Sequence, residues 1–88
     1  MKNPKQLERY FKGAANHNRI EILKIVAKNE GINVDDISKK LNADFKNISQ
    51  HTHRLVAAGL LNKKYSGNNV QHSLSPYGEK FIKFFTEF

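Results

Sequence analysis

The stretch between residues 46 and 54 combines amides, hydroxyls, imidazoles and cations, and it contains no carboxylate. If this stretch is a helix with Ile48 pointing inward, a turn of about 100° per residue places most of these groups outward. Amides and cations pair with base edges in the major groove, and cations also bind phosphates, which an acidic face would repel. We therefore expect contact with double-stranded DNA, the alternative being an ordinary solvated helix face. The candidate DNA-binding residues here are Lys46, Asn47, Ser49, Gln50, His53 and Arg54.

Within this face, each side chain type favours a different target. Gln50 can pair with adenine edges, Lys46 and Arg54 can bind guanine or phosphate, and Ser49 can bind either. Phe45, at the start of the helix, could pack against the preceding turn or touch a thymine methyl group, and we expect packing.

The charge distribution supports an anionic partner. The net charge is +7, but residues 45–78 hold four Lys or Arg and no Asp or Glu, whereas residues 1–44 hold nine and six. Soluble surfaces normally mix both signs, so the loss of every carboxylate over a long segment favours a polyanion over a solvated surface.

Hydrophobic periodicity predicts the helices that position this face. We expect a first helix over residues 4–12 capped by Asn3, and a second, mostly buried helix that is closed by residues 29–31. A short third helix should begin with a capping box of Asn33 and Asp36, and the fourth should span residues 44–58. Two short helices joined by about three residues form a helix-turn-helix.

Residues 61–74 alternate in polarity around a Ser-Gly-Asn-Asn turn, which predicts a β-hairpin. Its polar side chains could lie along the DNA backbone or enter a minor groove. Alternatively, they could form a solubilising edge that prevents strand pairing. The candidate DNA-binding residues of this wing are Lys63, Lys64, Asn68 and Asn69.

A final helix is predicted from the cap at Ser75, and it is rich in phenylalanine. The aromatic side chains of the two terminal helices exceed what so small a core can bury, and exposed apolar patches of that size normally mark interfaces. We therefore predict a homodimer. Its candidate interface residues are Leu7, Tyr10, Phe11, Tyr77, Phe81, Phe84, Phe85 and Phe88.

Composition excludes several classes of function. The chain of 88 residues fits one domain, residues 1–88, and the absence of cysteine removes disulfides, thiolate metal sites and cysteine nucleophiles. His51 and His53 are two residues apart and do not converge on a helix, so we expect no metal site and no response to zinc, arsenite or peroxide. We find no catalytic constellation, cofactor motif, membrane span or secretory signal, and we expect a cytoplasmic protein that is not an enzyme.

The chain resembles the ArsR-type winged-helix repressors over nearly its whole length. AANHNRIEIL is similar to their "NPxRLxIL", HSLSPYGEKF to the "YRLTPEG" after the wing, and NVDDISKKLNADFKNISQHTHRLVAAGLL to "TVSELAEALGLSQSTVSRHLKVLREAGLV". The middle match is the specific one because it runs without a gap. The positions in register there are Ile37, Leu41, Ile48, Ser49, His51, Leu55, Ala58, Gly59 and Leu60.

The chain also departs from this family. The cysteines of its metal and thiol sensors are absent, and the last helix offers only Glu79 and Glu87, so the known sensing sites do not transfer. Thr52 replaces a core leucine; its hydroxyl can bond the backbone carbonyl one turn earlier, but it fills less space, so we expect a slightly looser core there.

The resemblance implies an α+β, mainly α fold: a winged helix-turn-helix with a two-stranded wing and a C-terminal helix. It implies a sequence-specific transcriptional regulator, most simply a dimeric repressor that reads the major groove with helix 44–58 and the backbone or minor groove with wing 61–74. The alternative is a winged helix used as a protein-interaction module.

Overall fold

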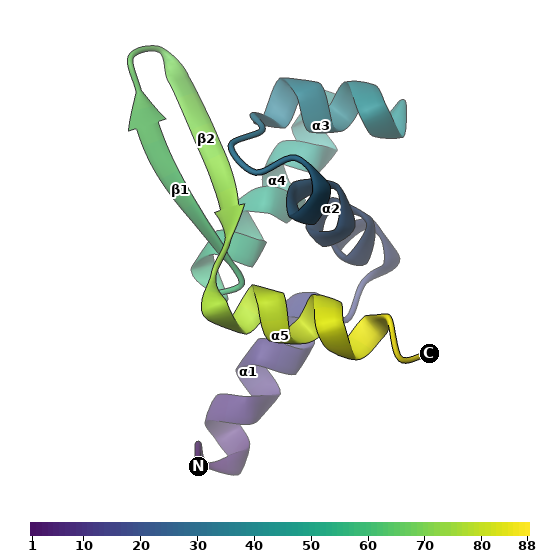
Figure 1. Cartoon of the computed structure of the whole chain (residues 1–88), viewed down its shortest axis with the longest axis vertical. Helices are drawn as coiled ribbons and strands as arrows, with labels where there is room; N and C mark the ends of the chain where they lie inside the picture. The colour runs from purple at the N-terminus through teal and green to yellow at the C-terminus, as the bar shows by residue number, and fades with distance from the viewer.

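The computed structural model describes all residues from 1 to 88 and shows a winged helix-turn-helix, as predicted (Figure 1). The chain is mainly helical, and its one sheet is an antiparallel hairpin. The hairpin stands beside α4, while α1 and α5 lie together at the opposite end of the molecule (Figure 1). The elements are α1 (Pro4–Ala14), α2 (His17–Lys28), α3 (Val34–Leu41), α4 (Phe45–Ala57), β1 (Leu61–Ser66), β2 (Asn69–Leu74) and α5 (Pro76–Phe85).

Polar side chains cap every helix at its N-terminus, where backbone N–H groups lack helical partners. The predicted capping box at α3 is only half formed: Asn33 accepts the amide of Asp36 at 2.8 Å, but the short Asp36 side chain does not bond back. The complete box is at α1, where the longer Gln6 side chain accepts the amide of Asn3 at 2.9 Å and the reciprocal bond is also present.

The first helix extends beyond its predicted end at Lys12. It continues to Ala14, and its buried Gly13 lies against α4. A β-carbon added at Gly13 would lie 2.5 Å from the Cβ of Ala58, well inside van der Waals contact. Glycine is therefore needed here for the close approach of two helices rather than for a helix end.

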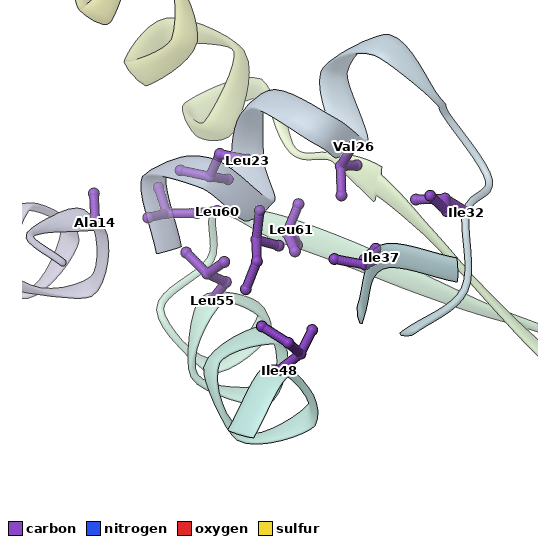
Figure 2. Packing of buried hydrophobic residues seen from close by; sticks show 10 residues of the cluster. Ala14, Leu23, Val26, Ile32, Ile37, Ile48, Leu55, Leu60 and Leu61 are labelled. Carbon is purple, nitrogen blue, oxygen red and sulfur yellow. The ribbon is translucent and has the colours of Figure 1, made fainter. Parts of the chain in front are cut away.

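The core lies between α2, α3, α4 and the start of β1. Side chains from these elements point into one cluster in Figure 2, with α2 at its centre. Burial of this cluster fixes the orientation of α4, because one side of α4 must face inward. The buried apolar residues are Ala14, Ile22, Leu23, Val26, Ile32, Ile37, Ile48, Leu55, Leu60 and Leu61.

Thr52 occupies a core position on α4 and is only 2% exposed. The hydrogen bond that it could form to the preceding turn is absent, since its Oγ1 has no hydrogen-bond partner. The hydroxyl is instead buried beside a small cavity under the hairpin, which Thr52 lines.

The hairpin has the predicted turn, with Ser66 paired to Asn69 and Gly67 at a φ of +61°. A positive φ at the first of the two central residues suits a type II′ hairpin turn. The base of the hairpin is fixed to the loop before α3: the amide of Gly31 donates to the carbonyl of His72 at 2.8 Å, and the amide of His72 donates to the carbonyl of Ile32 at 3.0 Å.

Candidate nucleic-acid interface

The outward face of α4 is arranged as the helical period predicts. Its predicted DNA-binding residues are exposed, apart from Ser49, which is half-buried, and the opposite side of the helix is buried. The side chains of Lys46, Gln50, His53 and Arg54 form no hydrogen bond or ion pair within the chain. Their donors and acceptors are therefore free to bind another molecule.

Two other side chains border this face at the N-terminal end of α4: the acidic Asp44 and the aromatic Phe45. The Asp44 carboxylate is directed to the helix backbone, where it accepts the amide of Asn47 at 3.1 Å. Phe45 is 53% exposed, so about half of its surface is open to a partner, and its packing against the preceding turn stays a prediction.

The wing places its two lysines on opposite faces, because neighbouring residues of a strand point in opposite directions. Lys63 pairs across the hairpin with His72, and Lys64 pairs with Gln71. Lys63 therefore faces α4, where it lines a cavity of about 170 Å³ together with Ser49 and other residues. Lys64 faces away from that cavity.

The two wing asparagines also differ. Asn68 is exposed at the turn, whereas the Oδ1 of Asn69 accepts the side-chain amide of Asn33 at 3.1 Å. Asn33 is the cap of α3, so this bond joins the tip of the wing to the helix-turn-helix. Asn69 consequently fixes the wing in place and is less free than Asn68 to bind a partner.

Two histidines next to this interface are partly shielded from water. Burial lowers the pKa of His51 below its usual range, and the nearby cations Arg19 and Arg54 lower it further. Burial also lowers the pKa of His72, although its hydrogen-bond contact with the Ile32 carbonyl, at 3.1 Å, opposes this shift. The surroundings of both rings therefore favour the neutral form of the imidazole.

The structure adds basic residues that the sequence analysis did not select. Arg9, Lys12 and Arg19 line one cleft with Arg54, at the junction of α1, α2 and α4. The absence of carboxylates on one stripe of α1 was a weak signal for Arg9, but only the packing of three elements brings these cations together.

The predicted dimer residues form a second exposed surface, between α1 and α5. We call it the aromatic hollow; its volume is about 290 Å³. The rings of Phe11 and Phe81 meet edge to face at 5.1 Å, and those of Tyr10 and Tyr77 lie 4.7 Å apart. The hollow is lined by Lys2, Leu7, Tyr10, Phe11, Tyr77, Lys80, Phe81 and Phe84.

Two of the predicted interface residues lie outside this hollow. Phe85 is half-buried and packs against the core. Phe88 follows the end of α5, is 94% exposed, and meets Phe84 edge to face at 5.1 Å. The structure thus brings six of the eight predicted residues together.

Side chains able to bind metal do not gather in groups of three or more. No helix has the length and apolar character needed to cross a membrane.

The fold is shared with solved winged-helix transcriptional regulators. HlyU from Vibrio cholerae N16961 is 28% identical, with a TM-score of 0.86 over 98% of this chain and 94% of that one. The transcriptional repressor PagR of Bacillus anthracis is 23% identical, with a TM-score of 0.83 over 92% of this chain and 93% of that one.

A third structure is the homodimeric winged helix-turn-helix DNA-binding domain of Mb0332 from Mycobacterium bovis, described as a possible ArsR-family regulator. It is 24% identical, with a TM-score of 0.78 over 93% of this chain and 73% of that one. At these identities, the PagR and Mb0332 structures show the fold alone. No curated protein matches the chain. Residues 15–79 match the family described as HVO_A0114, and the chain belongs to that family.

Proposed function

We propose that the protein is a sequence-specific DNA-binding transcriptional regulator, acting as a dimeric repressor of the ArsR type. The observation that supports this most directly is the outward face of α4: it is exposed, it lacks carboxylates from residue 45 to residue 57, and its long polar side chains have no partners within the chain. A face of this kind has unused hydrogen-bonding groups that match base edges and phosphates. The solved neighbours support the same class of function.

In this proposal α4 enters the major groove and Gln50, at the centre of its face, pairs with an adenine. Lys46 and Arg54 bind guanine or phosphate, and Asn47, Ser49 and His53 complete the face. The wing lies along the backbone or in the adjacent minor groove, where Lys63, Lys64 and Asn68 are exposed and Asn69 is held by its bond to Asn33.

The aromatic hollow supports the dimeric part of the proposal. Its walls are apolar side chains that remain half-exposed in one chain, and a second copy would remove them from water. The solved domain of Mb0332, which has the same fold, is described as homodimeric. A two-fold dimer would place its two reading helices about one duplex turn, or roughly 34 Å, apart on an inverted repeat.

The test is a gel shift with the DNA upstream of the protein's own gene, with an unrelated duplex as competitor and with salt varied. We expect the upstream duplex to bind at least about a thousandfold more tightly than the competitor at physiological salt, as is typical of specific binding. A reporter gene behind the bound duplex should be repressed when the protein is expressed. Equal binding to both duplexes, or none, would contradict the proposal and favour a protein-interaction module.

A further inference from the structure

The reading helix α4 has two flanks, and only one of them faces the wing. On the wing side lie Ser49 and Val56, which line the cavity shared with the hairpin. On the other side lie Arg54 and Ala58, which face the junction of α1 and α2. Arg54 follows Gln50 by four residues, so it lies one helical turn further along the same outward face.

The second flank forms a basic cleft of about 310 Å³, lined by Arg9, Lys12, Gly13, Arg19, Arg54, Ala57 and Ala58. Its lining contains four cations and no carboxylate. The remaining residues are glycine and alanine, so the centre of the cleft is open. The Glu8 carboxylate lies 3.7 Å from the Lys12 ammonium, but both groups are well exposed, and such a pair is weak in water.

Arg19 differs from the other three cations because the fold already uses it. Its guanidinium donates to the carbonyls of Lys12 and Gly13 at 3.4 and 3.2 Å, and its Nε lies 3.4 Å from the Nδ1 of His51. Arg19 therefore joins the end of α1 to α2 and α4, and it adds a fixed positive charge behind the cleft. Arg9 and Arg54 have no partner within the chain and are exposed.

The dimensions of B-DNA indicate which part of the duplex this cleft would contact. The major groove is about 12 Å wide, and a helix with its side chains is roughly 10 to 12 Å across. A helix that fills the groove therefore has one sugar-phosphate strand along each flank. If the wing meets one strand, the basic cleft on the opposite flank of α4 would face the other.

We propose that Arg9, Lys12 and Arg54 bind the phosphodiester backbone of the DNA strand opposite the wing, with Arg19 as a positioning residue. This inference rests on the proposed DNA-binding function and extends it to a second backbone contact made partly by α1. Contacts of this kind fix the orientation of the protein on the duplex without reading its sequence.

The test is the salt dependence of binding, measured by fluorescence anisotropy with the full chain. The variants are Arg9→Gln and Lys12→Gln, and the matched control is Lys83→Gln, an exposed lysine on α5 that lies outside the cleft. One lost phosphate contact should reduce the slope of log affinity against log salt by about 0.9 per subunit, which is roughly eightfold in affinity at 0.1 M salt. We expect this loss with Arg9→Gln on the upstream duplex and on an unrelated duplex alike, and no loss with Lys83→Gln.

The position of the contact is tested with duplexes in which single phosphates are replaced by neutral methylphosphonates. The replacement that weakens the wild type but not Arg9→Gln identifies the phosphate bound by Arg9. It should lie across the major groove from the phosphate identified in the same way with Lys64→Gln.

The outcomes separate this inference from the proposed function. If the wild type prefers the upstream duplex and Arg9→Gln and Lys12→Gln keep its salt slope, the second backbone contact is refuted while the regulator remains. If the wild type shows no sequence preference, the proposed function is refuted and the inference with it. Thermal unfolding followed by circular dichroism checks that each variant is folded.

Discussion

The outward face of α4 and the aromatic hollow are both exposed, but they differ in what they lack. The rings of the hollow contact one another at about 5 Å, and they remain open to water. The long polar side chains of the α4 face are exposed and have no protein partners. The hollow gains free energy from any apolar surface that excludes water, whereas the α4 face gains it only from groups that replace its water hydrogen bonds.

The cations near the two surfaces also differ in whether they already have a partner within the chain. Lys2 lies over the rings of Tyr10 and Tyr77, at 5.3 and 5.1 Å, so cations at the hollow are already engaged. The cations of α4 are unpaired, and no carboxylate shares their face. A carboxylate introduced into either surface should therefore disable it, for a different reason in each case.

The largest effect is expected from Phe11→Glu, which places a carboxylate in the aromatic hollow. Burial of an unpaired charge in a dimer interface would cost about 3 to 5 kcal/mol, so the dimer should dissociate at micromolar concentration. Sedimentation velocity measures this. The control is Tyr65→Glu, which replaces an exposed aromatic residue of the wing outside the hollow and should remain dimeric. A wild type that is itself monomeric would refute the dimer.

A smaller effect is expected from Gln50→Ala on the α4 face. Loss of a bidentate base contact should cost about 1 to 3 kcal/mol and remove the preference at one base pair in each half-site. Binding to a set of duplexes with single base changes measures it. Lys64→Ala is the control, since the loss of a contact to the DNA backbone should weaken binding to all sequences equally. An unchanged preference in Gln50→Ala would show that α4 is not the reader.

The next variant, Thr52→Val, tests how the buried polar side chain on the inward side of α4 affects stability. The buried hydroxyl of Thr52 has no partner, so its replacement by a methyl group of similar size should raise the free energy of unfolding by about 1 kcal/mol. Urea unfolding measures the change. Ser38→Ala is the matched control: the buried Ser38 hydroxyl donates to the Asp35 carbonyl at 2.8 Å, and its loss should destabilise the fold. A less stable Thr52→Val would mean that the hydroxyl has a partner in solution.

The smallest effect is expected from pH. The folded state lowers the pKa of His51 and His72 from 6.5, mainly through burial, so the unfolded state binds more protons near that pH. Stability is therefore fully present above pH 6.5 and decreases as the pH falls through 6.5 toward the lowered pKa values. Urea unfolding at pH 7.5 and 5.5 measures the slope. His72→Gln should reduce this slope, and an unchanged slope in His72→Gln would contradict the role of burial at this ring.

The sequence predicted the elements of this fold and the exposed face of α4, because each depends on periodicity within one segment. The inward and outward sides of α4 followed from the position of Ile48 alone. The strand period likewise places Lys63 and Lys64 on opposite faces of the wing.

Contacts between distant segments could not be predicted in this way. The bond of Asn69 to Asn33 and the approach of Arg9 to Arg54 depend on which elements pack together, and local periodicity does not contain that information. The unpartnered hydroxyl of Thr52 depends on a side-chain rotamer in the finished core. The sequence therefore identified the α4 face but missed the basic cleft beside it.

The close approach of Gly13 to Ala58 has a mechanical consequence. At this point α1 and the end of α4 touch without long side chains between them, so there is no flexible layer that would let one helix move independently of the other. In a dimer formed through α1 and α5, the two reading helices would keep a fixed separation and a fixed angular phase. Each base pair inserted between half-sites rotates one of them by about 34 to 36° around the duplex axis. Binding of such a dimer would therefore depend on the number of base pairs between the half-sites as strictly as on the bases within them.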